Sequence, residues 1–380
     1  MTADTPACRR LYRSFFCIKI ESTIMKKLRV ALIYNAYIDG AVESPADTGS
    51  IRSLRCMIRG MTRALRKGGS EVAVVPLADD LRSFQRTLQR FRPDVIFNQY
   101  DDVVHGALYE MRVAALVRIM GYPITGSPAL ALGLSRDKYM CVSLLHGARI
   151  PIPPDTALCE RIRDVDGPKW TFPLIVQPSQ EHAGIGVARD SVVRTKKELR
   201  NKVREILGQY HQPALVQRFL PGREFNVGLV GGKKIRVLPL AEVDYSRLPG
   251  RVPPIMSYAA KWIETSVEYQ RISVTCPAEV ESGLESQISS SAVKAFRAIG
   301  GWGYGRVDVR LDEDSVPRIL EVNCNPCLDD GMGLARSAGA AGIPYPELLN
   351  LIIRAAFEGP PHDIHIPMTF VASRRGPAHK

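Results

Sequence analysis

The sequence lacks several features that would place a protein in a familiar class. No apolar run in its 380 residues approaches the roughly 18 residues that a membrane-spanning helix needs, and it has no low-complexity tract or internal repeat. It contains neither a Walker phosphate-binding loop nor a dinucleotide-binding fingerprint. Zinc fingers, aromatic RNA-reading motifs and KH-type loops are missing as well. These absences exclude a membrane-spanning helix and the common nucleotide- and nucleic-acid-binding modules.

Cysteine is present but not in a metal-binding or redox pattern. Of the eight cysteines, Cys324 and Cys327 alone form a CxxC. A zinc ribbon needs a second such pair, and a redox CxxC is expected at the start of a helix, whereas this one follows an expected strand. We therefore interpret the cysteines as packing thiols of a protein in a reducing cytoplasm.

The chain is basic, with a formal net charge of +12 and a sequence pI of about 9.4. Such a balance favours acidic small molecules or nucleic acid as partners. The densest basic stretch, residues 81–92, alternates an arginine row with an apolar row at helical spacing. A solvated helix face accounts for that pattern, so we expect no nucleic-acid partner.

Strand and helix patterns alternate through the first third of the chain. Strands are expected at 28–35, 71–77 and 92–100, with helices between them and at 108–121. This order predicts an N-terminal doubly wound α/β domain over residues 25–136. Residues 1–24 offer little to bury, so we expect a disordered extension that can be removed without loss of stability or activity.

Beyond residue 136 runs of strands with fewer helices predict α+β domains. Helices are expected near 195–208 and 279–299. The predicted boundaries are a central domain at 137–215, a C-terminal domain at 216–357 and a tail at 358–380.

Residues 306–323 are predicted to form a β-hairpin in which two carboxylates face each other. Polar and apolar residues alternate on both sides of a turn-forming segment, and a turn centred between residues 314 and 315 places Asp308 opposite Glu321. Like charges at such a position repel by roughly 3 kcal/mol at an effective dielectric near 20. The opposite, core face would then consist of Val307, Val309, Leu311, Leu320 and Val322.

Two explanations fit this carboxylate pair. The face can simply be wet, since water weakens the repulsion and Arg306 and Arg310 are near. Alternatively a cation lies between Asp308 and Glu321, and the amide oxygen of Asn323 completes a hard-oxygen set suited to Mg²⁺. Because Mg²⁺ commonly binds substrate phosphates, the second explanation predicts phosphate-binding groups elsewhere.

Five further residues, of three types, could bind a phosphorylated ligand. Gly184 and Gly186 lie in a loop between two strands, where backbone N–H groups could approach an anion, although an ordinary turn explains them too. Lys138 and Lys261 are lone lysines in apolar settings; each could bind a phosphate or remain at the surface with a buried stem. Glu224, at the start of a strand, could bind a ribose or face water.

The order of these motifs makes them specific. Over residues 121–326 the chain reads GYPITGSPALALGLSRDK, IVQPSQEHAGIG, VQRFLPGREFNVG, AAKW, GYGRVDV and ILEVNCNP. This series resembles the ATP-grasp superfamily, and most closely its D-alanine–D-alanine ligase-like branch, over nearly all of residues 26–357. The resemblance implies a three-domain ATP-grasp architecture, mixing α/β and α+β, with ATP held between the central and C-terminal domains.

The resemblance also assigns roles to individual residues. Lys138 and the residue at position 177, here Gln177, would contact the nucleotide phosphates, and the loop with Gly184 and Gly186 would close over them. The adenine would be bound by Gln217, Phe219 and Leu220. The ribose would be bound by Glu224. Metal-binding roles, for Mg²⁺ or alternatively Mn²⁺, fall to Asp308, Glu321 and Asn323. Catalytic roles fall to Lys261 at the γ-phosphate and Arg306 at the reacting centre.

The implied activity is that of an ATP-dependent carboxylate–amine ligase. It joins a small carboxylate and an amine, such as amino acids or peptide-like metabolites, through an acyl phosphate and releases ADP and phosphate. A homodimer is possible. Two alternatives stay open, namely a true D-alanine–D-alanine ligase with a divergent pocket and a nucleotide-binding protein with little ligase activity.

The departures from the family pattern bear on these alternatives. Gln177 stands where the family usually has lysine, which removes a positive charge, although Arg189 could replace it. Ala183 and Trp262 replace a serine and a tyrosine. Asp329 and Asp330 lie near the place of a carboxylate-binding serine, so we expect the acceptor to present no bare carboxylate there, unless both aspartates point to solvent or cap a helix.

Overall fold

The computed structural model describes residues 27–35, 48–78, 80–101 and 108–360, and side chains in its first helix from residue 55 onward. The expected extension at 1–24 and residues 361–380 of the expected tail lie outside these residues. No helix in the described ranges is both long and apolar enough to cross a bilayer.

The N-terminal sheet is parallel, with strand order β2-β1-β3. Its strands and helices are β1 (Arg29–Asn35), α3 (Thr48–Lys67), β2 (Glu71–Leu77), α4 (Leu81–Phe91), β3 (Val95–Gln99) and α5 (Tyr109–Ile119). Alternate residues of β1 pack on opposite sides: Leu32 contacts the core under α3, and Ile33 the core under α4 and α5. Helices thus cover both faces, as the prediction of a doubly wound unit requires.

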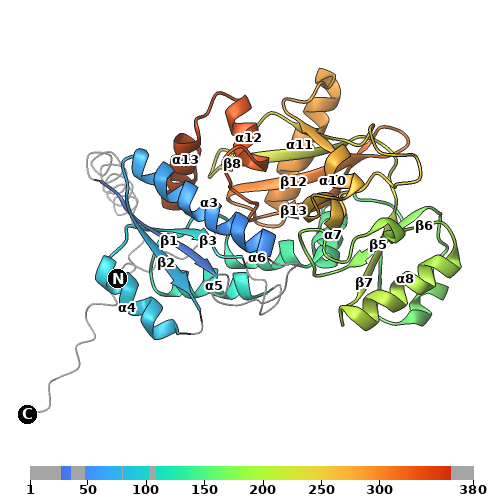
Figure 1. Cartoon of the computed structure of the whole chain (residues 1–380), viewed down its shortest axis with the longest axis horizontal. Coiled ribbons are helices and arrows are strands. Elements are labelled where there is room, and N and C mark those ends of the chain that lie inside the picture. The colour runs from blue at the N-terminus through green and yellow to red at the C-terminus, as the bar shows by residue number, and fades with distance from the viewer. Residues whose placement is uncertain (1–26, 36–47, 79, 102–107, 361–380) are drawn as a thin grey trace, which may run out of the picture.

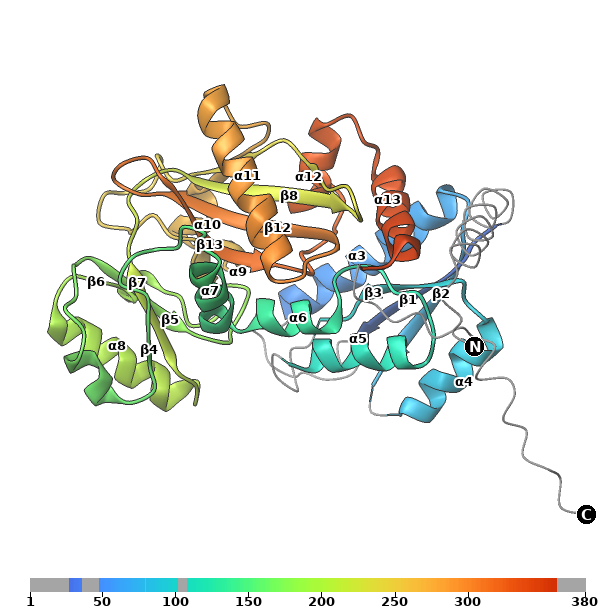
Figure 2. The same cartoon turned by 180° about the vertical axis from the view of Figure 1, so that it is seen from behind.

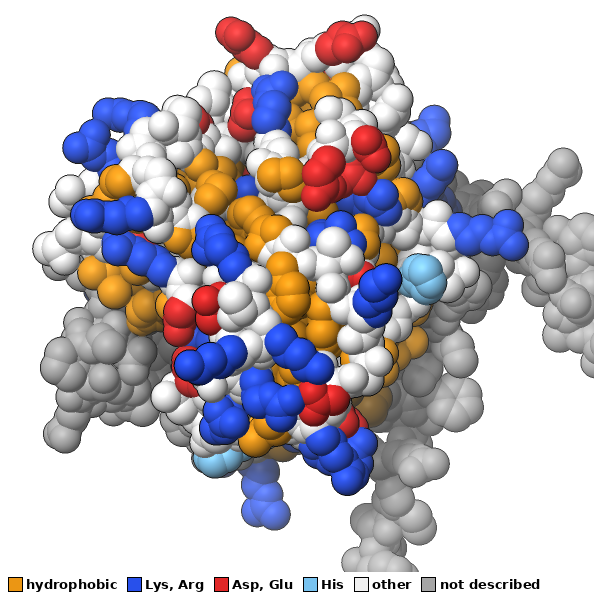
Figure 3. Space-filling model, turned by 90° about the vertical axis from the view of Figure 1, so that its right-hand side faces the viewer, with side chains coloured by type: hydrophobic (Ala, Val, Ile, Leu, Met, Phe, Trp, Pro, Cys, Tyr) orange, Lys and Arg blue, Asp and Glu red, His pale blue; other side chains and the backbone are white. Residues whose placement is uncertain are grey.

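A small antiparallel sheet, with strand order β4-β7-β5-β6, forms one end of the molecule. Its elements are β4 (Ala157–Cys159), η1 (Ile162–Asp166), β5 (Leu174–Pro178), η2 (Arg189–Ser191), β6 (Val192–Val193), α8 (Lys196–Gln209) and β7 (Ala214–Arg218). Leu199, Val203 and Ile206 of α8 share one buried core with the sheet. The outer surface of this end carries basic and acidic side chains intermixed (Figure 3).

The third sheet is the largest and has the strand order β11-β10-β8-β12-β13, with β9 paired to β8. Its strands are β8 (Glu224–Gly231), β9 (Arg236–Val237), β10 (Ala241–Asp244), β11 (Ser273–Thr275), β12 (Gly303–Leu311) and β13 (Pro317–Asn323). Ile288, Ala292 and Phe296 of α11 (Ser282–Ala298) bury one face of the sheet. Figure 2 shows α11 lying across this sheet on that side. Asn226, Asp308 and Glu321, which are polar residues of β8, β12 and β13, line a cavity together with residues of the small sheet.

In chain order, the remaining described helices lie between β3 and β4, between β10 and β11, and after β13. They are α6 (Ala129–Arg136), α7 (Lys138–Gly147), α9 (Tyr258–Trp262), α10 (Val267–Arg271), α12 (Gly333–Ala340) and α13 (Tyr345–Glu358). The C-terminal α13 packs against α3, so the end of the described chain returns to the N-terminal sheet. The domain boundaries themselves stay predictions.

The β12–β13 hairpin confirms the predicted register near the carboxylates and corrects it toward the turn. Asp308 pairs with Glu321 and Arg306 with Asn323, as expected. Beyond Asp308 a β-bulge shifts the register, so that Val309 pairs with Ile319 rather than with Leu320. The predicted core position of Leu320 was therefore wrong. Ile319 is fully buried instead, and the extra residue of the bulge leaves Leu320 on the cavity face beside Glu321.

Candidate active site

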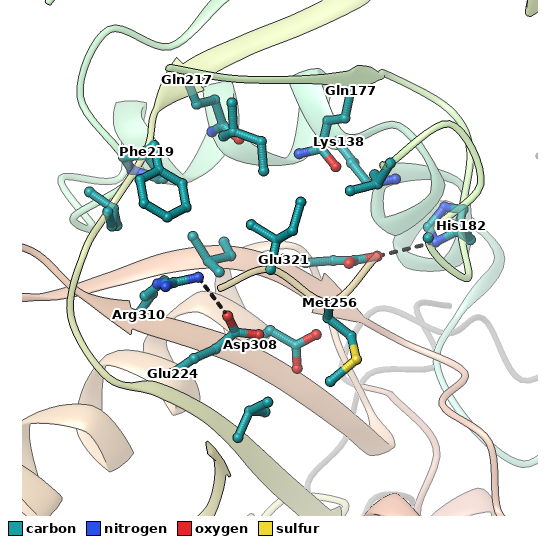
Figure 4. A pocket seen from close by; sticks show the side chains of 18 of the residues that line it. Lys138, Gln177, His182, Gln217, Phe219, Glu224, Met256, Asp308, Arg310 and Glu321 are labelled. Carbon is teal, nitrogen blue, oxygen red and sulfur yellow. Dashed lines mark hydrogen bonds and ion pairs between the residues drawn. The ribbon is translucent and has the colours of Figure 1, made fainter. Parts of the chain in front are cut away.

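A cavity of about 240 Å³ lies between the small sheet and the polar face of the large sheet. Figure 4 shows side chains entering it from both sheets and from α7. The predicted site residues that line it are Lys138, Gln177, Gly184, Gln217, Phe219, Leu220, Glu224, Lys261, Arg306, Asp308 and Glu321. Gly186 and Asn323, which were also predicted, do not line it.

The glycine loop between β5 and β6 is seated tightly on α9. Gly184 and Gly186 have φ angles of +81° and +74°, a region that favours glycine. The indole N–H of Trp262 donates to the carbonyl of Ala183 (2.9 Å), and the N–H of Tyr258 donates to the carbonyl of Val187 (3.1 Å). The loop therefore covers the cavity in a defined conformation.

Replacing Gly184 by alanine should displace this loop. A Cβ there would lie 2.9 Å from the backbone N of Tyr258, and a left-handed conformation costs a non-glycine residue roughly 1–2 kcal/mol. We expect ATP to bind about tenfold more weakly or worse, as calorimetric titration would measure. Gly208→Ala in α8, where a Cβ meets nothing within 4 Å, is the matched control. Equal ATP affinity of the two variants would contradict a role for the loop.

The end of the cavity at which adenine and ribose are expected contains an arginine that the sequence reasoning did not assign. The guanidinium of Arg310 lies over the rings of Phe219 (5.1 Å) and Tyr245 (5.4 Å) and donates to Oε2 of Glu224 (3.0 Å). The hydroxyl of Tyr245 donates to the same Oε2 (2.9 Å). Burial raises the pKa of Glu224 and Arg310 opposes this rise. Oε1 of Glu224 has no hydrogen-bond partner among the described residues and can accept from a ligand hydroxyl.

Hydrogen bonds to residues next to strands of the small sheet hold the segment that precedes Glu224. Nε2 of Gln217 donates to Oγ1 of Thr156 (3.2 Å), and the N–H of Phe219 donates to the carbonyl of Pro173 (3.0 Å). Leu220 is only 2% exposed. Bonds to the small sheet therefore position the edge of the cavity at which the adenine is expected.

Each of the facing carboxylates is in contact with polar or charged side chains in this structure. Arg306 donates to both oxygens of Asp308 (2.7 and 2.9 Å), and the amide of Asn226 donates to Oδ1 of Asp308 (2.9 Å). Nδ1 of His182 lies 3.1 Å from Oε1 of Glu321. Burial alone would raise the pKa of Glu321, but Lys138, His182 and Lys261 outweigh it and hold that pKa well below its usual value.

His182 is a second residue that the sequence reasoning missed. Its Nε2 lies 3.2 Å from the carbonyl of Arg136, so acceptors adjoin both ring nitrogens. Burial and the nearby Lys138 lower the pKa of His182. The contact joins the glycine loop to Glu321, and a histidine in a loop read only for its glycines carried no signal of it.

The two lysines bring positive charge into the cavity. Burial lowers the pKa of Lys138, and Lys261 adds to this effect while Glu321 opposes it. Burial and Arg306 likewise lower the pKa of Lys261. The ammonium of Lys138 donates to the carbonyl of Glu181, whereas no bond of the Lys261 ammonium is seen within the described ranges. Lys138 is buried and Lys261 is half-buried, and lysines placed in this way with few partners can bind an anion.

The donor set at the hairpin fits Mg²⁺ through two of its three predicted ligands. Carboxylate oxygens of Asp308 and Glu321 enter the same cavity as the lysines and are hard ligands. Oδ1 of Asn323 accepts from the backbone N–H of Asn325 (3.0 Å), outside the cavity lining. Within the described ranges no cluster of three or more His, Cys, Asp or Glu is found, so substrate oxygens and water would complete the coordination.

A buried polar network supports this region from the N-terminal side. Asn325 donates to Oε1 of Glu110 (2.5 Å) and accepts from the hydroxyl of Tyr304 (2.5 Å). Nε of Arg136 donates to Oε2 of Glu110 (2.7 Å). Burial raises the pKa of Glu110 to about 7, although Arg136 opposes the rise. The network fixes α5 and α6 to the end of the hairpin.

The structure also bears on the expectations for Arg189 and for the two aspartates at positions 329 and 330. Arg189, suggested as a substitute cation for the position of Gln177, donates to both carboxylate oxygens of Glu268 (2.6 and 2.8 Å) and does not line the cavity, so this suggestion was wrong. Asp329 is half-buried and Asp330 exposed, and neither lines this cavity. The N-cap position of α12 is Met332, so no aspartate caps that helix.

Comparisons with known proteins agree with this geometry. A family model described as the D-ala D-ala ligase C-terminus matches residues 156–354. A D-alanine–D-alanine ligase from Methylococcus capsulatus is 30% identical over 79% of this chain and 89% of its own. An uncharacterised Sinorhizobium fredii protein, y4sG, is 28% identical over 87% of this chain and 97% of its own. The D-alanine–D-alanine ligase of Bacillus anthracis complexed with ATP superposes with a TM-score of 0.64 at 21% identity, covering 87% and 98% of the two chains.

A cavity between two sheets, covered by a glycine loop and lined by lysines and facing carboxylates, is here combined with a matching ligase family model and a ligase relative, and together they define an ATP-grasp ligase. The family model covers just over half of the chain, and a 30% identical relative spans most of it. The chain belongs to the D-alanine–D-alanine ligase family.

Proposed function

We propose that this ligase joins a small amino acid, as the carboxylate substrate, to an amine through an acyl phosphate. A carboxylate oxygen attacks the γ-phosphorus of ATP, and the bond to the bridging oxygen breaks as ADP leaves with the electron pair. The amine nitrogen then attacks the acyl carbon, and the carbon–oxygen bond to phosphate breaks. Phosphate leaves with that electron pair, and the ammonium gives its proton to solvent, which yields an amide.

Each group in the cavity has a task in this scheme. Lys138 and the glycine loop hold the phosphates, and Lys261 binds the γ-phosphoryl oxygens. Glu224 accepts from the ribose through Oε1. Arg306, fixed by Asp308, stabilises the oxyanion that develops at the acyl carbon. The loop excludes water, which would otherwise hydrolyse the acyl phosphate.

Asp308 and Glu321, with Asn323 once it is freed from its backbone bond, are the residues that would hold Mg²⁺ or Mn²⁺. The metal would neutralise charge on the transferring phosphoryl group. Arg306 and His182 contact these two carboxylates in this structure: Arg306 forms an ion pair with Asp308, and His182 lies within hydrogen-bond distance of Glu321. Loading with metal therefore requires these two side chains to share or release their partners.

The observation that carries the proposal is the meeting of opposite charges in one covered cavity. Asp308 and Glu321 line the same space as Lys138 and Lys261. A structural ion-pair network would bring such charges into direct contact, whereas Lys261 has no bond to either carboxylate among the described residues. A metal-bound triphosphate would satisfy all four groups at once.

Release of ADP tests the proposal directly. The full chain would be incubated with ATP, Mg²⁺ and pairs of amino acids of both hands, D-alanine with D-alanine included. A ligase releases ADP only when a carboxylate and an amine substrate are both present. Release of no ADP with any pair, together with measurable ATP binding, would favour a nucleotide-binding protein instead.

Gln177→Lys should restore a missing charge. Gln177 lines the cavity on β5, and Arg189 does not replace it. A charge-assisted hydrogen bond is worth roughly 1.5–3 kcal/mol, so the variant is expected to bind ATP about tenfold or more tightly in calorimetric titration. Weaker binding would indicate that Lys138 and Lys261 already saturate the phosphates and that a third lysine only repels them.

A further inference from the structure

His182 joins the glycine loop to the hairpin that carries the proposed metal ligands. Its Nδ1 lies within hydrogen-bond distance, 3.1 Å, of Oε1 of Glu321, and Figure 4 shows the two side chains facing each other. Both are largely shielded from water, with exposed side-chain fractions of 16% and 24%. A hydrogen bond to a carboxylate keeps more of its strength where little water competes for it. The contact can therefore hold Glu321 in one orientation.

The two carboxylates of the hairpin are held in different ways. Both oxygens of Asp308 accept hydrogen bonds from Arg306, and one of them also accepts from Asn226. Oε1 of Glu321 contacts His182, whereas no hydrogen bond of its Oε2 to a described residue is found. A glutamate side chain that nothing holds has much rotamer freedom to lose when it binds a cation. The orientation of Glu321 therefore depends on His182, and Oε2 stays available for a ligand.

The backbone around His182 is anchored on both sides. The ammonium of Lys138 donates to the carbonyl of the preceding residue, and the indole N–H of Trp262 donates to the carbonyl of the following one (2.9 Å). The other ring nitrogen, Nε2, lies 3.2 Å from the carbonyl of Arg136 at the end of α6. The imidazole is therefore fixed between α6 and the hairpin, as a side chain that positions another must be.

We propose that His182 positions Glu321 for a divalent cation, so that the glycine loop contributes to metal binding as well as to nucleotide binding. This inference rests on the metal site of the proposed function and adds to it a residue that is not itself a ligand. Hydrogen bonds from outer residues orient ligating carboxylates, and their loss lowers metal affinity about ten- to hundredfold. Because His182 lies in the loop, displacement of the loop should weaken metal binding too.

Titration with Mn²⁺ tests the inference without any turnover. The full chain, saturated with ADP, would be titrated with Mn²⁺, and the electron paramagnetic resonance signal of free Mn²⁺ would give the affinity, with ADP alone as the blank. His182→Ala should bind Mn²⁺ about ten- to hundredfold more weakly than the unchanged chain. His182→Asn should recover most of that affinity, because its amide can place an N–H near the present position of Nδ1.

Two controls separate this role from a general loss of loop structure. The affinity for ADP without metal, measured by calorimetric titration, should stay nearly unchanged in His182→Ala. His146→Ala removes an exposed histidine of α7 and should change neither affinity. Equal weakening of Mn²⁺ and ADP binding in His182→Ala, or His182→Asn as weak as His182→Ala, would overturn the inference.

A double variant shows whether His182 acts through Glu321. If it does, adding His182→Ala to Glu321→Gln should lower the Mn²⁺ affinity little beyond the effect of Glu321→Gln alone, since coupled effects are not additive. Additive losses would mean that His182 acts on the cation independently of Glu321, which would contradict the proposed positioning.

The outcome is separable from that of the proposed function. Unaltered Mn²⁺ affinity of His182→Ala, in a chain that releases ADP with a substrate pair, would overturn the inference and leave the ligase function standing. A selective loss of Mn²⁺ affinity, in a chain that turns over no pair, would support the inference while the ligase function fails. Absence of Mn²⁺ binding by the unchanged chain with ADP would overturn the inference.

Discussion

Glu321→Gln and Asp308→Asn are each expected to lower turnover by at least about a hundredfold. Each substitution removes one of the two carboxylates proposed to hold the metal, and electrostatic groups at a reacting centre typically contribute two to three orders of magnitude. Asp308→Asn also releases Arg306, so its effect should be the larger one. The rate of ADP release at saturating ATP and Mg²⁺ measures both.

Glu313→Gln is the control for these variants, because Glu313 is exposed in the turn of the same hairpin. It should retain normal turnover. The melting temperature of Glu321→Gln should lie within a few degrees of that of the unchanged protein, because a neutral amide can keep the hydrogen bond to His182. Near-normal turnover of both carboxylate variants would show that the hairpin holds no catalytic metal.

Lys261→Met should lower kcat by about a hundred- to a thousandfold without destabilising the protein. The stability expectation follows from the pKa of Lys261, which burial and Arg306 hold below the ordinary value of 10.5. Between the two pKa values the folded chain binds fewer protons than the unfolded chain, so the contribution of this group to stability rises with pH. Methionine removes the buried charge, and the melting temperature at pH 7 should stay equal or increase.

The exposed Lys234 provides the control, as Lys234→Met removes a charge of the same kind far from the cavity lining. Scanning the melting temperature from pH 7 toward 10.5 would show a shallower rise for Lys261→Met than for the control. A melting temperature that falls by several degrees at pH 7 would instead mean that Lys261 is paired in the folded protein.

The sequence predicted the parts of the fold that depend on local periodicity. The apolar run of β1 and the alternating hairpin strands each have a physical period, and the structure confirms a parallel sheet and the pairing of Asp308 with Glu321. The bulge after Asp308 was not predictable in this way. A bulge adds one residue to a strand without changing the alternation of polar and apolar residues on either side. The register predicted from that alternation therefore placed Leu320 on the wrong face.

Site residues that act through tertiary contacts were also beyond sequence reasoning. Arg310 was read only as a charge beside the hairpin, yet it lies between two aromatic rings and holds Glu224. The charges of Asp329 and Asp330 were considered in the sequence analysis, whereas Arg336, six residues beyond Asp330, lines a smaller cavity that shares Asn226 and Arg306 with the first. Which of several nearby charges faces a cavity depends on the path of the loop into α12.

The contact between Trp262 and the glycine loop makes that loop visible to fluorescence. The chain has three tryptophans. Trp302 is 1% exposed, and the indole N–H of Trp170 donates to the carbonyl of Val165, away from the loop. Trp262 is 40% exposed and bonded to the carbonyl of Ala183, so a displacement of the loop would remove a hydrogen-bond partner of the indole and expose it further to water. Its emission would therefore report such a displacement in real time, without any attached dye.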